Sequence, residues 1–235
     1  MAGPPAQGIE ALATADGPIT LYPVHHASFV MRWNGHTIYV DPVGPAERYA
    51  GLGAPDLVLI THGHGDHLDT DTLDALDTGD ALMVMPQAVA DGLDMSHGKT
   101  RRVMANGDRI DTHGMTVDAM PMYNLPETPD SRHPKGWGNG YVLNMGGKRI
   151  YISGDTEGTD EMRALENIDL AFVCMNLPYT MGVEQAADAV AEFAPATVYP
   201  YHYRGQDIER FKTLVNQANP NVTVRLYDWY ASPDA

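Results

Sequence analysis

Residues 57–69 read LVLITHGHGDHLD, an apolar run that passes directly into a cluster of histidines. The run from 57 to 60 is short and continuously apolar, which is typical of a strand buried on both faces of a sheet. His62 and His64 are two residues apart at the end of this strand, so their side chains point to the same side. The glycines of the segment leave room for a crowded turn, which would bring Asp66 and His67 beside the first pair. Three imidazoles and one carboxylate in so short a segment are typical of a metal site.

Alternating and β-branched runs predict strands along the whole chain, and helical spacing predicts three helices. The strands are expected at residues 19–24, 28–33, 36–42, 57–60, 81–86, 115–124, 169–175, 196–203 and 222–227, and residues 141–156 are expected to form a hairpin of two strands. These helices are expected at 69–76, 183–193 and 208–215, and a further helix is expected near Asp160. Asn-Gly and Gly-Gly pairs predict tight turns at 34–35, 106–107 and 146–147, and the polar segment 125–140 is expected to be irregular.

Hairpins come first in this pattern and β-α alternation follows, with no Pro/Gly/Ser-rich linker between them. This order predicts a single α/β domain over residues 18–235, with two sheets and helices outside them. Residues 1–17 are rich in alanine, glycine and proline and are interpreted as a flexible tail.

The composition excludes several classes of function. The chain has 235 residues with 31 acidic and 15 basic side chains, a formal net charge of −16 that disfavours long nucleic acids as partners. No segment approaches the roughly 18 consecutive apolar residues of a membrane span. The single cysteine, Cys174, excludes an intrachain disulfide and lies in an apolar run, as a buried small side chain would. The compartment stays open between a cytoplasmic protein and an exported one with its signal removed.

The segment HGHGDH (62–67) resembles the HxHxDH signature of metallo-β-lactamase-fold hydrolases. Three later landmarks occur in the order that this family shows: His133 in a loop, Asp155 in SGDT after a strand, and His202 at the end of a late strand. The resemblance extends over residues 19–227. It implies an αββα sandwich, in which two mixed sheets pack face to face with helices on the outer faces. The stretches 25–43, 138–157 and 198–203 are most similar to the branch that contains the L-ascorbate-6-phosphate lactonase.

Position by position, the resemblance implies two divalent metal ions, zinc or manganese. One would be held by His62, His64 and His133, the other by Asp66, His67 and His202, and Asp155 would bridge both. Taken singly, His133 is equally typical of a surface loop, Asp155 of a turn, and His202 of a buried core histidine. Their occurrence together and in order favours the metal site.

A water that bridges two such ions loses a proton easily, since its pKa falls from about 16 towards roughly 7. The resulting hydroxide would attack an ester-like bond of a small molecule, in a lactone, a carboxylic ester or a phosphoester. Asp66 and His67 are the expected catalytic residues, with Asp66 orienting the nucleophile. The acid for the leaving group stays open among Tyr179, Tyr203 and Thr156, which adjoin ligands or late loops.

Substrate contacts are expected near His133. Arg132, Lys135 and Trp137 share its loop, and Arg204 follows His202, so these cations could hold an anionic group or be solvated. Tyr179 lies in a late loop and is a further candidate for substrate binding. His26 follows the first expected strand, and we place it near the metal pocket as a hydrogen-bond partner or substrate contact, or simply as a histidine at a strand end.

Four alternatives remain open. The same fold supports phosphodiesterases of nucleotides or RNA, and true β-lactamases usually lack a carboxylate where Asp155 stands. A non-catalytic metal-binding protein would be expected to have lost ligands, whereas a di-iron centre would be expected to have more acidic ligands. The sequence leaves the oligomeric state open, with a homo-oligomer as one possibility.

Overall fold

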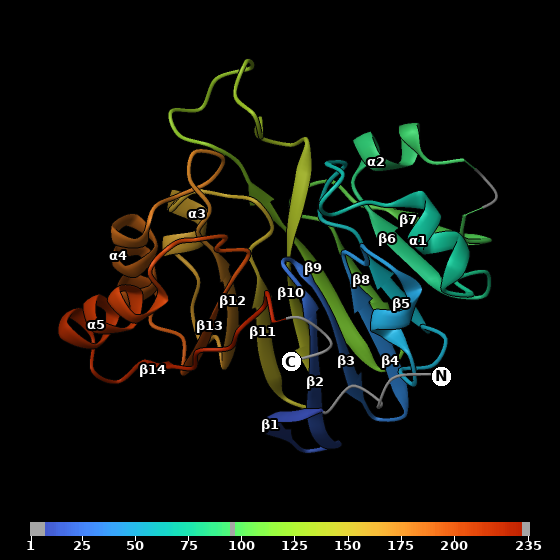
Figure 1. Cartoon of the computed structure of the whole chain (residues 1–235), viewed down its shortest axis with the longest axis horizontal. Helices are drawn as coiled ribbons and strands as arrows, with labels where there is room; N and C mark the ends of the chain where they lie inside the picture. The colour runs from blue at the N-terminus through green and yellow to red at the C-terminus, as the bar shows by residue number, and fades with distance from the viewer. Residues whose placement is uncertain (1–7, 95–96, 232–235) are drawn as a thin grey trace. The chain divides into compact units, whose positions relative to one another are not determined.

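The computed structural model describes residues 8–94 and 97–231. By its contacts the chain divides into two compact units, residues 1–104 with 229–235 and residues 105–228. Each unit contains one mixed sheet of seven strands among the described residues (Figure 1). Within the described ranges, no helix is both long and apolar enough to cross a bilayer.

The strands of the first unit lie side by side in sequence order. They are β1 (Ile9–Thr14), β2 (Gly17–His25), β3 (Ser28–Trp33), β4 (His36–Val40), β5 (Leu57–Leu59), β6 (Leu82–Met85) and β7 (Thr100–Val103). Neighbours are antiparallel from β1 to β4 and parallel from β4 to β7. Asn34 and Gly35 have φ values of 48° and 80°, so the β3–β4 hairpin has the tight turn that the sequence predicted.

Short helices cover one face of this sheet. They are η1 (Ala46–Tyr49), α1 (Thr70–Ala75) and α2 (Gln87–Gly92). Leu73 of α1 and Val89 of α2 pack in one apolar cluster with Val58 and Met83 of the sheet. Asp69 caps α1 by accepting a hydrogen bond from the backbone N–H of Asp71. Every residue of β5 is buried, as its continuous apolarity predicted.

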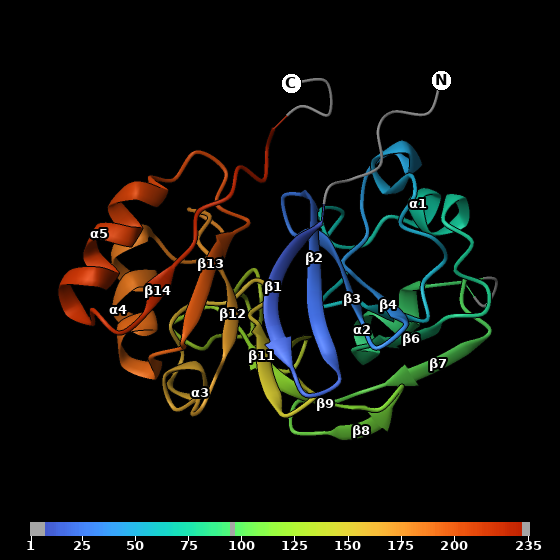
Figure 2. The same ribbon diagram turned by 90° about the horizontal axis from the view of Figure 1, so that it is seen from below.

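The first residues differ from the prediction. Ile9–Thr14 is not part of a tail but forms β1, which pairs with β2 along most of its length (Figure 2). The composition of residues 1–17 as a whole is rich in Ala, Gly and Pro and hid this strand, whose own sequence is IEALAT. Pairing with a long neighbouring strand supplies its backbone hydrogen bonds. Residues 1–7 of the predicted tail lie outside the described residues.

The second unit repeats the same strand pattern. Its strands are β8 (Arg109–Thr112), β9 (Met115–Met122), β10 (Gly138–Met145), β11 (Lys148–Ile152), β12 (Leu170–Cys174), β13 (Thr197–Tyr201) and β14 (Thr223–Val224). Neighbours are antiparallel from β8 to β11 and parallel from β11 to β14. The helices α3 (Asp160–Arg163), α4 (Val183–Phe193) and α5 (Ile208–Ala218) lie on one side of this sheet (Figures 1 and 2).

Most predicted elements are present, and the differences are at polar or short segments. Helix α4 has the predicted bounds, α5 extends beyond the predicted end at 215, and the last strand has only two residues. Besides β1, the sequence analysis missed η1, α2, β7 and β8. Strands β7 and β8 are the edge strands of their sheets and have mostly exposed side chains, so no alternation of apolar residues marks them.

The change from antiparallel to parallel pairing determines where the polar loops lie. Parallel neighbours have their carboxyl ends at one edge of the sheet, where ligand-binding loops of α/β sheets gather. In the first unit Asp41 follows β4 and His62 follows β5. In the second unit Asp155 follows β11 and His202 follows β13. Each unit therefore carries candidate site residues at the corresponding edge of its own sheet.

Candidate metal centre

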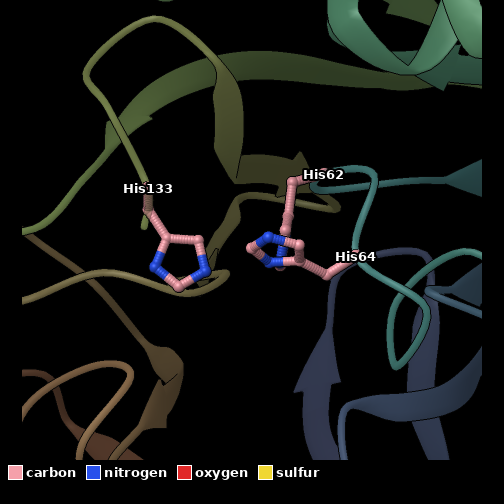
Figure 3. Close-up of side chains that lie close together, drawn as sticks. All are labelled: His62, His64 and His133. Atoms are coloured by element: carbon pink, nitrogen blue, oxygen red, sulfur yellow. The ribbon is translucent and has the colours of Figure 1, made fainter. Parts of the chain in front are cut away.

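The histidine cluster of the first unit lies in the tight turn after β5. The backbone N–H groups of His67 and Leu68 both donate to the carbonyl oxygen of His64, and this turn brings His67 back beside His62. The ring centroids of His62 and His67 are 4.0 Å apart. Those of His62 and His64 are 4.9 Å apart, edge to face, and Figure 3 shows these two side chains next to each other. His62 and His67 are fully buried. The expected return of the chain after the glycines is therefore observed within this unit.

A buried aspartate that the sequence analysis did not identify holds this cluster. Asp41 follows β4 directly and is fully buried. Its Oδ2 lies 2.7 Å from Nδ1 of His67, and it accepts hydrogen bonds from the backbone N–H of Thr61 at 2.7 Å and the Thr61 hydroxyl at 2.6 Å. A carboxylate only accepts, so Nδ1 of His67 carries the proton. The Nε2 atom of His67 is then the electron-pair donor, as a metal ligand requires.

Thr61 determines the tautomer of His62 in the same way. Its hydroxyl proton is donated to Asp41, so its oxygen accepts from Nδ1 of His62 at 3.0 Å. Nε2 of His62 is therefore also an electron-pair donor. The sequence contains only one sign of the roles of Asp41 and Thr61, which is that each lies at the end of a predicted strand.

His26 lies against the Asp66 carboxylate. Its Nε2 is 3.2 Å from Oδ2 of Asp66, and its Nδ1 is 2.6 Å from the hydroxyl of Tyr230. The backbone N–H of His26 also donates to the carbonyl oxygen of Trp229. The ring is buried, whereas the Asp66 side chain is 38 % exposed. This placement agrees with His26 as a hydrogen-bond partner of Asp66, and its role in substrate binding stays a prediction.

The second unit brings together the other three predicted ligands. His133 projects from the loop before β10 (Figure 3), and Asp155 and His202 follow β11 and β13. Oδ2 of Asp155 lies 3.4 Å from Nε2 of His133, and Oδ1 lies 3.5 Å from Nε2 of His202. All three side chains are buried. One carboxylate therefore presents a different oxygen to each of two imidazoles.

Asn124 settles which nitrogen of His133 carries the proton. Its Oδ1 accepts from the backbone N–H of His133 at 2.9 Å and lies 3.0 Å from Nδ1, while its Nδ2 donates to the carbonyl oxygen of Tyr179. Nδ1 of His133 is therefore the donor, and Nε2 of a neutral ring directs its lone pair towards the Asp155 carboxylate. Two electron-pair donors facing each other at this distance repel unless a cation lies between them.

The donor groups of each unit fit a divalent transition metal. In the first unit His62 and His67 present Nε2 lone pairs. In the second unit His133 does the same, and the buried Asp155 carboxylate adds negative charge that a cation would compensate. Imidazole and carboxylate together suit zinc, manganese or iron. The residues of both units thus have the chemistry that the ligand predictions require.

The cations of the His133 loop differ in their surroundings. Nζ of Lys135 lies 2.7 Å from Oε1 of Glu161 and 3.5 Å from a carboxylate oxygen of Glu127. The guanidinium carbon of Arg132 lies 4.5 Å from the ring centroid of Tyr179. Lys135 is therefore engaged by acidic groups of the protein, which leaves Arg132 as the better candidate for a substrate anion. Arg204 is exposed.

Two candidates for the leaving-group acid, Thr156 and Tyr203, have hydroxyl groups that already form hydrogen bonds with the backbone. Thr156 is buried, and its hydroxyl lies between the backbone N–H and carbonyl groups of Tyr123. The Tyr203 hydroxyl donates to the carbonyl oxygen of Tyr227. Tyr179 is 40 % exposed.

The single cysteine, Cys174, is fully buried. Burial, together with the negative charge of Asp155, raises its pKa to about 12. This agrees with its interpretation as a small core side chain.

Glu161 of α3 anchors the loop that carries His133. It accepts a hydrogen bond from the Tyr123 hydroxyl at 2.7 Å as well as the ion pair from Lys135. Partial burial raises the pKa of Glu161, but the hydrogen bonds from Lys135 and Tyr123 outweigh it, so the net shift is downwards. The hydrogen bond with Glu161 in turn raises the pKa of Lys135.

Replacing Glu161 with glutamine is expected to lower the free energy of unfolding at neutral pH, because Lys135 loses its charged partner. Since the folded-state pKa of Glu161 lies below that of the unfolded chain, this stabilisation is present above about pH 4.3 and is lost as the pH falls through the folded pKa. Urea unfolding of both proteins at several pH values measures the difference. Glu166→Gln, at an exposed glutamate, is the control, and a difference that persists unchanged in acid would contradict the assignment.

Comparison with known proteins agrees with this chemistry. A family model described as the β-lactamase superfamily domain matches residues 20–202. The chain belongs to this superfamily. A UPF0173 metal-dependent hydrolase of Pelotomaculum thermopropionicum is 32 % identical over 82 % of this chain and 90 % of its own length. One from Lysinibacillus sphaericus is 29 % identical over 84 % of this chain and 92 % of its own.

Solved structures show the same relationship. The crystal structure of a metal-dependent hydrolase from Parabacteroides distasonis has a TM-score of 0.84 and 36 % identity, with 94 % of this chain and 97 % of that one covered. Igni18, a metallo hydrolase from Ignicoccus hospitalis, has a TM-score of 0.76 over 91 % of this chain and 96 % of its own; at 24 % identity it shows the fold. The predicted metallo-β-lactamase fold and metal-dependent hydrolase class are confirmed. The ascorbate-phosphate lactonase branch stays a prediction.

Proposed function

We propose that this hydrolase uses two divalent cations, zinc or manganese, to cleave an ester-like bond in a small molecule. His62, His64 and His133 would hold one ion, Asp66, His67 and His202 the other, and Asp155 would bridge them. The proposal requires both units to serve one site, within a single domain over residues 18–235. When bound, the ions would lower the pKa of a coordinated water and polarise the carbonyl or phosphoryl oxygen of the substrate.

The observation that carries the proposal is the Asp155 carboxylate, whose two oxygens face Nε2 of His133 and Nε2 of His202. The hydrogen bond to Asn124 makes Nε2 of His133 a lone-pair donor, so a cation is the natural third partner. With one oxygen turned towards each imidazole, Asp155 would be able to serve as a ligand of both ions. Asp66, which is partly exposed and contacts His26, is suited to orient the nucleophile.

The proposed ligands must also be held in the tautomer that binds a metal, and other residues of the protein do this. Asp41 and Thr61 hold two rings in the ligating tautomer, and burial of these groups excludes water from their hydrogen bonds. The substrate is expected to be a lactone, a carboxylic ester or a phosphoester. Phosphodiester cleavage in nucleotides is the second candidate, and the net charge of −16 disfavours long nucleic acids.

The test is elemental analysis of the purified protein, followed by a panel of a γ-lactone, p-nitrophenyl acetate and bis(p-nitrophenyl) phosphate. About two equivalents of metal per chain are expected, with turnover that a chelator abolishes and zinc or manganese restores. Turnover of the phosphodiester alone would assign the second candidate. One equivalent of metal, or ester cleavage that survives complete metal removal, would contradict the binuclear mechanism.

A further inference from the structure

Exposed apolar side chains of the second unit gather in two loops. Among the described residues, the large hydrophobic side chains that are exposed are Val103, Leu125, Leu177 and Tyr179, at 38 to 53 %. Leu125 lies in the loop that carries His133, and Leu177 and Tyr179 lie in the loop after β12. Exposing large apolar groups costs free energy, so their concentration in two loops indicates a contact surface.

Both loops lie at the edge of the sheet that carries the candidate ligands. Strand β12 lies between β11 and β13 and is parallel to both, so the loop after it opens at the edge where Asp155 and His202 lie. Asn124 joins the two loops, because its Oδ1 accepts from the backbone N–H of His133 and its Nδ2 donates to the carbonyl oxygen of Tyr179 at 2.9 Å. The hydrogen bonds of Asn124 therefore connect the loop of Leu177 and Tyr179 to the loop of His133, which is a predicted metal ligand.

A cation accompanies these apolar groups. The Arg132 guanidinium lies over the Tyr179 ring at 4.5 Å, whereas the neighbouring Lys135 is paired with Glu161. No carboxylate among the described residues forms an ion pair with Arg132. A guanidinium held over an aromatic ring still directs N–H groups outwards in its own plane, where they can bind a carboxylate or phosphate.

We propose that Leu125, Leu177, Tyr179 and Arg132 form a recognition rim for the part of the substrate that does not react. This part would combine an apolar chain or ring, which packs on the two leucines and Tyr179, with an anionic group that Arg132 binds. The inference rests on the proposed function, since it supplies the substrate class for the same site. It predicts that small neutral esters are poor substrates compared with longer, anionic ones.

The test compares p-nitrophenyl acetate, butyrate and hexanoate with the p-nitrophenyl monoester of hexanedioic acid. The value of kcat/KM is expected to rise about fourfold for each added methylene that is fully buried, and about tenfold more for the terminal carboxylate. Leu177→Ser and Tyr179→Ala are expected to lower the hexanoate-to-acetate ratio. Arg132→Gln is expected to remove the preference for the carboxylate while keeping the dependence on chain length.

Matched controls come from β7 of the first unit, where an exposed arginine, Arg102, is next to an exposed apolar residue, Val103. Arg102→Gln and Val103→Ser are expected to leave both ratios as they are in the wild type. A readout without turnover is calorimetric binding of hexanoate, hexylammonium and acetate. Hexanoate is expected to bind more tightly than the other two, and Arg132→Gln and Tyr179→Ala are expected to weaken it.

The outcomes separate this inference from the proposed function. Metal-dependent ester cleavage with no dependence on chain length or charge would overturn the rim and leave the hydrolase mechanism standing. Selective hexanoate binding that the rim variants abolish, without any ester cleavage, would keep the rim and contradict the ester substrates. A dimer that dissociates in Leu177→Ser would assign these side chains to self-association and overturn the inference.

Discussion

Asparagine in place of Asp155 is expected to reduce the bound metal well below the wild-type content and to lower kcat/KM by about 10³-fold. The substitution keeps the shape of the side chain but removes the negative charge between Nε2 of His133 and Nε2 of His202. An amide can present one oxygen but not two, so one of the two imidazoles would face an N–H group. Metal content by emission spectroscopy and steady-state kinetics on the same preparation measure both effects.

The control for this substitution is Asp188→Asn, an exposed aspartate whose carboxylate pairs with Arg163 in the same unit. It is expected to retain full metal content and activity, since surface ion pairs contribute little. Circular dichroism and thermal unfolding of both variants exclude misfolding as the cause of a loss. If Asp155→Asn bound the normal amount of metal and turned over at the wild-type rate, the bridging role would be wrong.

Replacing Asp41 with asparagine is expected to weaken metal affinity by about 10- to 100-fold, although Asp41 is no predicted ligand. Its carboxylate accepts three hydrogen bonds, two from Thr61 and one from Nδ1 of His67. The amide NH₂ of asparagine would face a donor in either orientation, which leaves one buried donor unsatisfied at a cost of about 1–3 kcal/mol. The preference of His67 for the Nε2-ligating tautomer is lost with it.

The measurement is competition with a chromogenic chelator, and the matched control is Asp56→Asn. Asp56 also accepts from a backbone N–H group of the first unit, that of Thr37 at 2.7 Å, but it contacts none of the candidate ligands. Its variant is expected to bind metal as the wild type does. Equal losses in both variants would indicate general destabilisation and not a positioning role for Asp41.

Local sequence signals were sufficient to predict the structure wherever a residue's environment depends on its neighbours in the chain. The apolar run at 57–60 predicted the buried strand β5, the Asn34-Gly35 pair predicted the hairpin turn, and apolar spacing predicted the bounds of α4. The strand-to-turn segment at 62–67 likewise indicated that His67 returns beside His62. Edge strands β7 and β8 were missed because exposed side chains carry no such signal.

Residue pairs that are distant in sequence could not be identified in this way. Asp41 forms a hydrogen bond with His67 because β4 and β5 are parallel neighbours. No local sequence pattern near either residue indicates that these two strands pair. The different surroundings of Arg132 and Lys135, which sequence reasoning treated alike, depend on where α3 places Glu161. In the same way, only the tertiary structure showed that residues 9–14 find a partner in β2.

The sequence by itself determined the residue types for metal chemistry, their order, and the β-rich fold that carries them, because these depend on local periodicity and ligand character. The tertiary structure decided the protonated nitrogen of His62, His67 and His133, the partners of Asp41 and Asp155, and the different surroundings of Arg132 and Lys135. Those properties depend on hydrogen bonds between strands and loops that are far apart in the chain, and burial makes each of them strong enough to determine the state of the side chain.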